Sequence, residues 1–345
     1  MSVAASSRRR VTGGVRALSP RAAVVRRFGP WPVAIAFFVL VPLVLRNDYY
    51  IDVASVAMTF VVLGAAFNLL YGYVGLLSFA QVAFFGIGGY ATAWLVTATE
   101  LWQPLAFLAG GLVAALAAWV VGVVTVRLSE GAFAIITLSF TLLCAVVAAE
   151  WTGVTGGRQG LFGLPAPKFA IGTVELEAVS PGQYLWLLSA FTLAALWGMH
   201  RIVVSPVGKV LVAIRDNEAL AKAQGYCTNR YKLGVFVAAA FVTGIAGALH
   251  VFRLTAIDPS VFDFYLMQVM LIVVILGGAG TFWPVIVSAV AFAALPEFLR
   301  LADEARLLLY GVLLVVGLVF TPQGLGGTLK ERAVRRRLRD LEEDR

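Results

Sequence analysis

Apolar runs long enough to cross a lipid bilayer follow one another along this chain, and no other feature restricts its fold so strongly. A transmembrane helix needs about 20 mostly apolar residues, because the hydrocarbon core is about 30 Å thick and a helix rises about 1.5 Å per residue. Hydrophobic residues make up 60% of the 345 residues and charged residues only 13%, whereas soluble domains are about 45–50% apolar. The sequence therefore predicts an all-α polytopic membrane protein with about ten transmembrane helices.

The predicted spans are separated by charged residues, Pro and Gly. Their approximate limits are 30–45, 51–71, 76–98, 104–126, 131–150, 183–199, 233–254, 266–282, 284–300 and 307–320. The first run is followed by Arg46-Asn47-Asp48 rather than by a small-residue cleavage site, so we expect a retained span and not a signal peptide.

The basic residues gather in three segments, which hold 20 of the 27 Lys and Arg. They are an arm at 1–29, the segment 200–232 and a tail at 321–345, and ten spans that start inside place all three in the cytoplasm. This asymmetry is typical of membrane proteins and makes nucleic-acid binding a weak explanation of the net charge of +8. We therefore predict a transmembrane domain over 30–320 with both termini cytoplasmic.

The segment 151–182 is predicted to be an extracytoplasmic loop, since it follows five spans and is rich in Gly and Pro. A short hairpin is expected near Phe169–Ala178. Cys144 and Cys227 have no partners at metal-ligand spacing, and the two histidines are predicted near opposite membrane faces, so no metal site or cofactor is predicted.

Two groups of small residues stand out within the predicted spans. Gly72, Gly75, Gly86, Gly88 and Gly89 lie in and around the third span. They indicate either a broken helix beside a substrate path or close helix packing, and the sequence leaves both open. A small residue at every fourth position of the fourth span indicates a packing face; these are Gly110, Ala114, Ala118 and Gly122.

Polar and charged residues divide differently along the spans. The ionisable ones lie at span ends: Asp52, Glu150, Arg253, Glu297 and Arg300. The span interiors carry neutral polar groups: Asn68, Ser78, Gln81, Thr137, Ser139, Thr141 and Gln268. A proton-coupled carrier would need an ionisable relay at membrane depth. This pattern therefore favours a pathway that is opened and closed by conformational changes, with the energy supplied by a component outside the lipid bilayer. No stretch fits G-x-x-x-x-G-K-[ST], so we predict neither an ATPase nor another enzyme.

Ser205–Lys232 is amphipathic and charged, with a helix expected from Lys209 that Gly225 ends. Val210, Leu211, Ile214, Leu220 and Ala221 are expected to face the membrane body or a groove, leaving Arg215, Asp216, Glu218 and Lys222 polar. Two interpretations remain open from spacing alone. The segment is either an interfacial helix on the lipid surface or a docking helix for a soluble partner.

Asn68–Tyr90, NLLYGYVGLLSFAQVAFFGIGGY, resembles the N-L-x-x-G-Y-x-G-x-x-S-x-x-x-x-x-F-x-G-x-G-x-Y stretch of branched-chain amino-acid ABC importer permeases of LivM type. The resemblance covers about 52–325. Its other stretches, in the family's order, are Thr155–Leu161 (TGGRQGL), Ser205–Lys232, Gly277–Pro284 (GGAGTFWP), Leu295–Arg300 (LPEFLR) and Leu309–Leu325 (LYGVLLVVGLVFTPQGL).

The resemblance implies import of leucine, isoleucine or valine across a bacterial plasma (inner) membrane. It also implies a second membrane permease subunit, two cytoplasmic ABC ATPase subunits and an extracytoplasmic solute-binding protein as partners. Polarity and family position suggest a translocation pathway formed by Asn68, Gly72, Tyr73, Gly75, Ser78, Gln81, Phe84, Gly86, Gly88, Tyr90 and Gln268. The ATPase-coupling region suggested by the resemblance comprises Gly208, Arg215, Asp216, Glu218, Ala219 and Gly225.

Two departures from the family pattern leave alternatives open. The coupling stretch reads E-A-L-A-K-A-Q-G, with its glycine one position later than in E-A-A-x-x-x-G, so the coupling helix is placed by its region and not by a strict motif. Gln268 is the only polar residue before the GG of the eighth span, where many relatives carry an acid. An importer of urea, short-chain amides or other amino acids is the first alternative, and a secondary carrier or channel is the second.

Overall fold

The computed structural model describes residues 30–99, 102–164, 169–171, 174–176, 180–298, 324 and 326–327. The predicted arm 1–29, the predicted span 307–320 and nearly all of the tail 321–345 lie outside the described residues. The chain divides into two compact units, Met1–Phe37 and Phe38–Arg345, and the sites described below lie in the second.

Long apolar helices make up most of the described chain, which confirms the all-α membrane fold. They are α2 (Trp31–Val44), α3 (Asp48–Val74), α4 (Ala80–Thr99), α5 (Gln103–Thr125), α6 (Glu130–Glu150), α8 (Pro181–Val204), α11 (Thr228–Leu254), α12 (Phe264–Gly277) and α13 (Phe282–Phe298). Seven described segments have the length and composition to cross a membrane: α3, α4, α5, α6, α8, α11 and the stretch Pro259–Gly277 that contains α12. The first nine predicted spans each lie on one of these nine helices; the total of ten stays a prediction.

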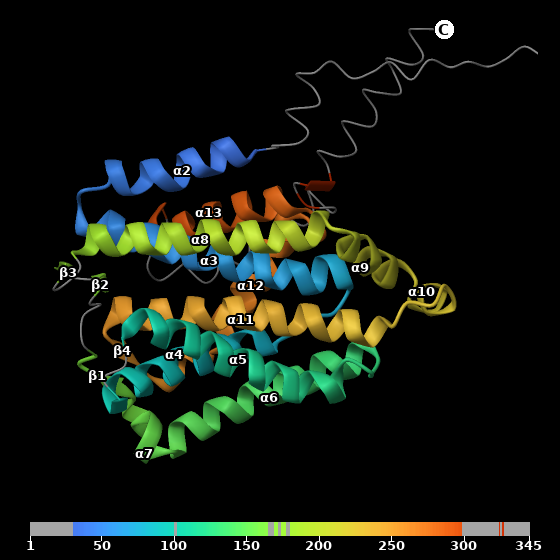
Figure 1. Ribbon diagram of the computed structural model, residues 1–345, viewed down its shortest axis with the longest axis horizontal. Coiled ribbons are helices and arrows are strands. Elements are labelled where there is room, and N and C mark those ends of the chain that lie inside the picture. Colours follow the sequence, from blue (N-terminus) through green and yellow to red (C-terminus); the bar gives the residue numbers. More distant parts are fainter. Residues whose placement is uncertain are drawn as a thin grey trace, which may run out of the picture. The chain divides into compact units, whose positions relative to one another are not determined.

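The core of the second unit is built around α3, α4 and α11, whose apolar residues are the most buried of the spans. α11 packs against α4 and α5, and α3 packs against α8, α12 and α13. Figure 1 shows these helices running alongside one another, with α9 and α10 at one end of the bundle and strands β1 and β4 at the other. We refer to these as the α9–α10 end and the β1–β4 end.

The small-residue face of α5 packs as predicted. A side chain on Gly110 would meet Thr92 and the Gly88 carbonyl of α4, and one on Gly122 would meet Leu233 and Phe236 of α11. Ala114 and Ala118 are fully buried between these contacts. The absence of side-chain bulk lets three helix backbones approach closely, so this face holds α5 onto the core.

The glycines near the third span mark a break in the helix at one position and allow close helix packing at others, so both alternatives that the sequence left open occur. The chain breaks between α3 and α4, where Gly75 has φ +85°. Farther along there is no break, because α4 runs without interruption through Gly86, Gly88 and Gly89. A Cβ on Gly88 would lie 2.2 Å from the carbonyl oxygen of Gly244, so Gly88 allows α4 to pack directly on α11.

Short elements connect the spans. They are α7 (Thr152–Thr155), η1 (Gly157–Gln159), β1 (Leu161–Phe162), β2 (Phe169–Ile171), β3 (Val174–Leu176), α9 (Pro206–Asp216), α10 (Glu218–Ala223), β4 (Ala256–Ile257) and η2 (Pro259–Phe262). The expected hairpin is confirmed, with β2 antiparallel to β3. β1 pairs antiparallel with β4 in the register Leu161 to Ile257, which ties the loop after α7 to the segment that follows α11.

Candidate functional site

The predicted coupling segment forms two helices rather than one. α9 begins at Pro206, three residues earlier than expected, and ends at Asp216. Asn217 then adopts an extended conformation, and its side chain accepts a hydrogen bond from the backbone N–H of Leu220 at 2.9 Å, which starts α10. Gly225, with φ +89°, follows the end of α10 as predicted.

The break at Asn217 changes which side chains point inward. Leu211, Ile214 and Ala221 are buried as expected, but Leu220 is 56% exposed, contrary to prediction. The interruption resets the helical phase, so spacing counted along one continuous helix no longer applies. Gly208 is buried against the last turn of α8, where a Cβ would lie 2.0 Å from the carbonyl oxygen of Val203.

Arg215 connects α9 to the buried core. Its Nη1 donates a 2.6 Å hydrogen bond to the carbonyl oxygen of Gly72, in the last turn of α3. Its Nε and Nη2 both donate to Oδ1 of Asp216, at 3.1 and 3.0 Å. A guanidinium held on one edge by a carboxylate and bound on the other to a helix C-terminus is a strong, oriented contact.

The turn between α12 and α13 completes this junction. Asn68 donates from Nδ2 to the carbonyl oxygen of Thr281, and its Oδ1 accepts from the N–H of Gly280, both at 3.0 Å. A Cβ on Gly280 would lie 2.6 Å from Nη1 of Arg215, and one on Gly72 would lie 2.3 Å from the N atom of Gly280. We call the set Asn68, Gly72, Arg215, Gly280 and Thr281 the Arg215 junction.

Glu218 secures α10 to α11. Its carboxylate accepts from Lys232 at 2.7 Å and from Thr228 at 2.9 Å, and it pairs with Lys222 at 3.1 Å. Desolvation alone would raise the pKa of Glu218, but the hydrogen bonds from Lys232, Thr228 and Lys222 lower it to about 2. Ala219 is exposed on the same short helix.

The break between α3 and α4 is held by α6. The backbone N–H of Phe79 donates to Thr137 at 3.2 Å, and Thr141 donates to the carbonyl oxygen of Phe79 at 3.1 Å. Irregular backbone inside a membrane protein requires such partners. Ser78, buried in this break, has an Oγ with no hydrogen-bond partner among the described residues.

Gln81 forms a buried polar contact between α4 and α11. Its Oε1 accepts a 2.8 Å hydrogen bond from Thr243, whereas its Nε2 is buried without a partner in the part of the chain that the structure describes. The sequence singled out Gln81 but missed Thr243, because residues 162 positions apart share no local pattern.

The other residues predicted to line the pathway have different surroundings. Phe84 packs edge-on against Phe236, with ring centroids 5.3 Å apart. Tyr90 stacks on Phe262 at 6.0 Å, and a Cβ on Gly86 would also meet the Phe262 ring. Tyr73 is buried in the last turn of α3, and Gln268 is exposed on α12. The structure therefore does not bring the predicted pathway residues into one cavity.

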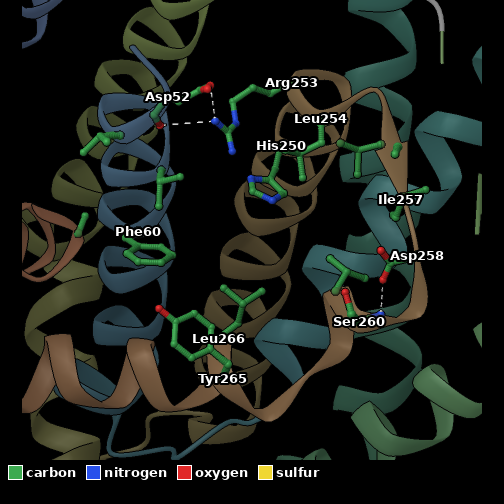
Figure 2. A pocket seen from close by; sticks show the side chains of 16 residues that line it. Asp52, Phe60, His250, Arg253, Leu254, Ile257, Asp258, Ser260, Tyr265 and Leu266 are labelled. Atoms are coloured by element: carbon green, nitrogen blue, oxygen red, sulfur yellow. Dashed lines mark hydrogen bonds and ion pairs between the residues drawn. The ribbon is translucent and has the colours of Figure 1, made fainter. Parts of the chain in front are cut away.

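A cavity of about 730 Å³ opens at the β1–β4 end. Residues of α3, α11, α12, α13 and the β4–η2 segment line it: Asp52, Val53, Val56, Phe60, His250, Val251, Arg253, Leu254, Ala256, Ile257, Asp258, Ser260, Val261, Tyr265, Leu266 and Ala293. Figure 2 shows His250 and Arg253 projecting from α11 into the space beside α3, with Asp258 and Ser260 on another wall. The cavity therefore combines apolar walls with charges of both signs.

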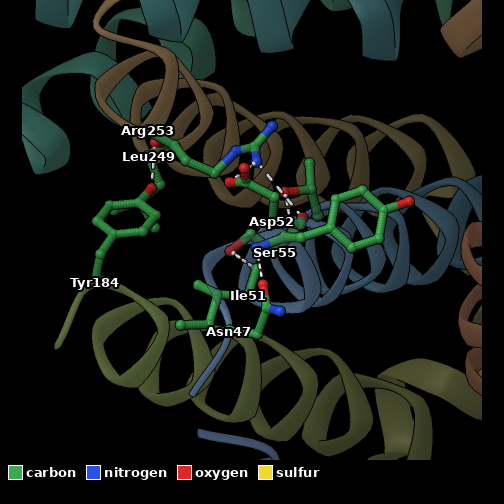
Figure 3. A network of polar contacts seen from close by, with 9 residues as sticks. Asn47, Ile51, Asp52, Ser55, Tyr184, Leu249 and Arg253 are labelled. Atoms are coloured by element: carbon green, nitrogen blue, oxygen red, sulfur yellow. Dashed lines mark hydrogen bonds and ion pairs between the residues drawn. The ribbon is translucent and has the colours of Figure 1, made fainter. Parts of the chain in front are cut away.

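An ion pair joins two helices at this cavity. Nη1 of Arg253 lies 2.7 Å from Oδ1 of Asp52, and Figure 3 shows this contact beside the hydrogen bond from Tyr184 to the carbonyl of Leu249. The Arg253 side chain is only 15% exposed, whereas that of Asp52 is 67% exposed. Nε of Arg253 and Nδ1 of His250 are buried without hydrogen-bond partners among the described residues.

Sequence reasoning noted Asp52 and Arg253 only as charges at span ends. A signal was available, because alternating spans place the start of the second and the end of the seventh on the same side. That the two side chains meet depends on α3 packing against α11. No three His, Cys, Asp or Glu residues within the described ranges are arranged to hold a metal ion.

Comparison with known proteins gives a family match over most of the chain. The family described as branched-chain amino acid transport system / permease component matches residues 49–318. This range contains the Arg215 junction, the Gln81–Thr243 contact and the cavity.

Individual relatives agree with this match. The high-affinity branched-chain amino acid transport system permease protein LivM of Salmonella typhimurium is 29% identical over 80% of this chain and 69% of its own length. LivM of Escherichia coli is 28% identical with the same coverage. The ribose import permease protein RbsC of Haemophilus influenzae is 26% identical over 75% of this chain and 77% of its own. No solved structure matches the chain.

Proposed function

Because this chain belongs to the permease family of branched-chain amino acid transport systems, we propose that it forms one half of the membrane pathway of an ABC importer for leucine, isoleucine and valine. Membership makes it a multi-pass ABC-type permease, in a family of transport proteins that generally work with ATPase and binding-protein partners. The substrate, the subunit composition and the orientation are the parts that we propose.

The Arg215 junction is the observation that carries the proposal. It binds the amphipathic pair α9–α10 to the C-terminal end of α3, the most buried span, and to the turn between α12 and α13. A helix that only rests on the lipid surface needs no such contact with the core. A helix that receives force from a soluble partner needs a rigid connection of this kind.

The α9–α10 end is proposed to face the cytoplasm. Arg201, Lys209, Arg215, Lys222, Arg230 and Lys232 all lie in or beside α9 and α10, and such concentrations of basic residues mark cytoplasmic segments. The β1–β4 end then faces outward. Both termini are cytoplasmic in this arrangement, as the spacing of the basic segments predicts.

The proposed complex contains a second membrane permease, two cytoplasmic ABC ATPases and an extracytoplasmic solute-binding protein. The printed sequence has no P-loop, so ATP hydrolysis is assigned to the partner subunits. In this mechanism ATP binding moves α9 and α10, and the Arg215 junction transmits the movement to α3 and to the turn that starts α13. The pathway then changes from inward-facing to outward-facing.

The proposed substrate follows the relatives named for branched-chain amino acids, which are the more similar of those compared above. The match to a ribose import permease makes a neutral sugar the competing substrate. Uptake measured in proteoliposomes that contain the complete importer and its binding protein decides between them.

We expect ATP-dependent accumulation of labelled L-leucine. Accumulation of ribose, urea or acetamide without L-leucine would overturn the proposed substrate, and uptake by this chain alone would indicate a secondary carrier.

The proposed route runs along the interior polar groups near Asn68, Ser78 and Gln81. Support comes from Ser78 and Gln81, whose side chains keep unused hydrogen-bonding capacity within the described bundle. Gln81→Leu should lower L-leucine uptake while insertion is unchanged; normal uptake would remove Gln81 from the route. Gly86→Leu would not test the route, because a Cβ there would lie 2.3 Å from the Phe262 ring and disturb packing.

Coupling is tested by substitutions at the two carboxylates of α9 and α10. Asp216→Lys with Glu218→Lys should separate ATP hydrolysis from uptake in the assembled importer. These changes remove the carboxylates that orient Arg215 and Lys232. If uptake per ATP hydrolysed is unchanged, α9 and α10 are an interfacial element and not a coupling element.

A further inference from the structure

The cavity at the β1–β4 end has a feature that helix packing leaves unexplained. Arg253 is largely buried, yet its two hydrogen bonds within the described chain both come from Nη1. One goes to the carboxylate of Asp52 and the other to the carbonyl oxygen of Asp52. Nε is buried and has no hydrogen-bond partner in the described part of the chain. Burying a polar group without a partner is costly, and His250 presents a second such atom, Nδ1, at the same cavity.

The guanidinium of Arg253 keeps N–H groups that Asp52 does not use. A guanidinium offers its N–H groups as a planar fork for carboxylates. Asp52 occupies only Nη1, and the buried Nε is out of reach from the cavity as the side chain lies, so Nη2 remains for a second anion. Figure 2 shows the guanidinium at the cavity, between α3 and α11.

Asp52 supplies the complementary charge. Its Oδ1 lies 2.7 Å from Nη1 of Arg253, and its side chain is 67% exposed. An ammonium group that approaches from the cavity can therefore contact the carboxylate of Asp52 while a carboxylate on the same ligand contacts Arg253. The ammonium and carboxylate groups of an α-amino acid are attached to the same carbon atom. They can therefore reach Asp52 and Arg253 together, because these two side chains are themselves in contact.

The remaining walls fit an aliphatic side chain. Val56 and Phe60 of α3, Leu266 of α12 and Ala293 of α13 line the same cavity. At about 730 Å³ the volume lies within the roughly 300–1,000 Å³ of small-molecule sites.

We propose that this cavity is a binding site for a free amino acid, with the α-carboxylate on the Arg253 guanidinium at Nη2 and the α-ammonium on Asp52. The inference rests on the proposed import of amino acids for its substrate class. In the proposed orientation the cavity faces outward, where it would receive the solute that the binding protein releases.

The test uses the full-length chain in lipid nanodiscs, with Ser260→Cys as a reporter in the cavity and with Cys144 and Cys227 changed to Ser. We expect millimolar L-leucine to slow alkylation of the reporter by N-ethylmaleimide several-fold. Leucinamide, which lacks the carboxylate, 4-methylpentanoate, which lacks the ammonium, and D-ribose should each protect it much less. Equal protection by D-ribose, or no protection by L-leucine, would overturn the proposal.

Variants separate ligand binding from a purely structural ion pair. Arg253→Gln should abolish protection by L-leucine. Arg158→Gln is the matched control, because Arg158 pairs with Glu150 at 3.3 Å outside the cavity and is 83% exposed. The exchanged pair, Asp52→Arg with Arg253→Asp, restores an ion pair between α3 and α11 but swaps the positions of the positive and negative charges, so L-leucine should not be bound in the same way. Persistence of protection in Arg253→Gln, or its full return in the exchanged pair, would show that the pair only joins helices.

This experiment and the uptake measurement can fail independently. L-leucine uptake by the complete importer without any protection of the reporter would refute the binding site and leave the proposed function standing. Protection without uptake would refute the proposed function and leave the binding site standing.

Discussion

Nη1 of Arg215 lies 2.6 Å from the carbonyl oxygen of Gly72, a hydrogen bond between residues 143 positions apart that joins α9 to the end of α3. The same carbonyl lies beside Gly280, whose N–H is bound by Asn68. One contact thus connects a surface helix, the most buried span and the turn between α12 and α13. This arrangement leads to the first of four predictions.

Arg215→Ala should weaken coupling more than folding. Loss of this contact removes the connection between α9 and α3 and is expected to lower uptake per ATP hydrolysed, whereas the cost to stability is limited to the contribution of a hydrogen bond to a charged group, about 1.5–3 kcal/mol. ATPase activity and uptake would be measured together in proteoliposomes with the partner subunits. Arg230→Ala, an exposed basic residue after α10, is the matched control. Equal losses in both variants would contradict a specific role for Arg215.

Gly72→Ala should destabilise the protein although it adds a single methyl group. The new Cβ would lie 2.0 Å from Oδ1 of Asn68 and 2.3 Å from the N atom of Gly280, so the Asn68 bridge must move or break. Overpacking of this kind costs about 1–3 kcal/mol. We expect a lower midpoint of thermal unfolding in detergent. Gly234→Ala is the control, since a Cβ there meets no atom within 4 Å, and a similar decrease in both would contradict the packing explanation.

Glu218→Gln should remove a stabilising contribution that depends on pH. The pKa of Glu218 is lowered from 4.5 to about 2 in the folded protein. Its ionised form is therefore stabilised by folding, and this stability is complete above about pH 4.5 and is lost as the pH falls towards 2. The difference in unfolding midpoint between wild type and Glu218→Gln should be constant from pH 7 to about 4.5 and shrink below it. A difference that persists unchanged at lower pH would show that the charge of Glu218 is not responsible.

Gln81 and Thr243 can be separated into structural and transport roles by a double substitution. Gln81→Leu alone leaves the buried hydroxyl of Thr243 without its acceptor, which should cost about 1–3 kcal/mol. Gln81→Leu with Thr243→Val removes both polar groups and should recover most of the stability. Transport should not recover with it if Gln81 lines the route. Full recovery of uptake in the double variant would make the contact purely structural.

Hydropathy and local composition predicted the membrane helices well. The nine long apolar helices described above, the packing face of α5 and the β2–β3 hairpin all lie where the sequence placed them, within about five residues. Each of these depends on interactions between neighbours in the chain: apolar length for a span, small residues every fourth position for a packing face, and turn residues for a hairpin.

One prediction failed because a local pattern was extended too far. A single helix from Lys209 was expected, but the side chain of Asn217 starts α10 after the end of α9, and the phase shift exposes Leu220. The glycines of the third span left a broken helix and close packing both open. Within α4 the helix is continuous, and Gly88 allows close packing against the backbone of α11.

The sequence by itself determined that this chain is a helical membrane protein and where most of its spans begin and end. It also predicted that the basic segments share one side of the membrane. Only the tertiary structure decided that Arg215 binds Gly72, that Gln81 binds Thr243 and that Arg253 pairs with Asp52 at a cavity. The physical reason is that hydrophobicity acts on each segment separately, whereas a polar contact forms only when packing brings together two groups that are 143, 162 or 201 residues apart.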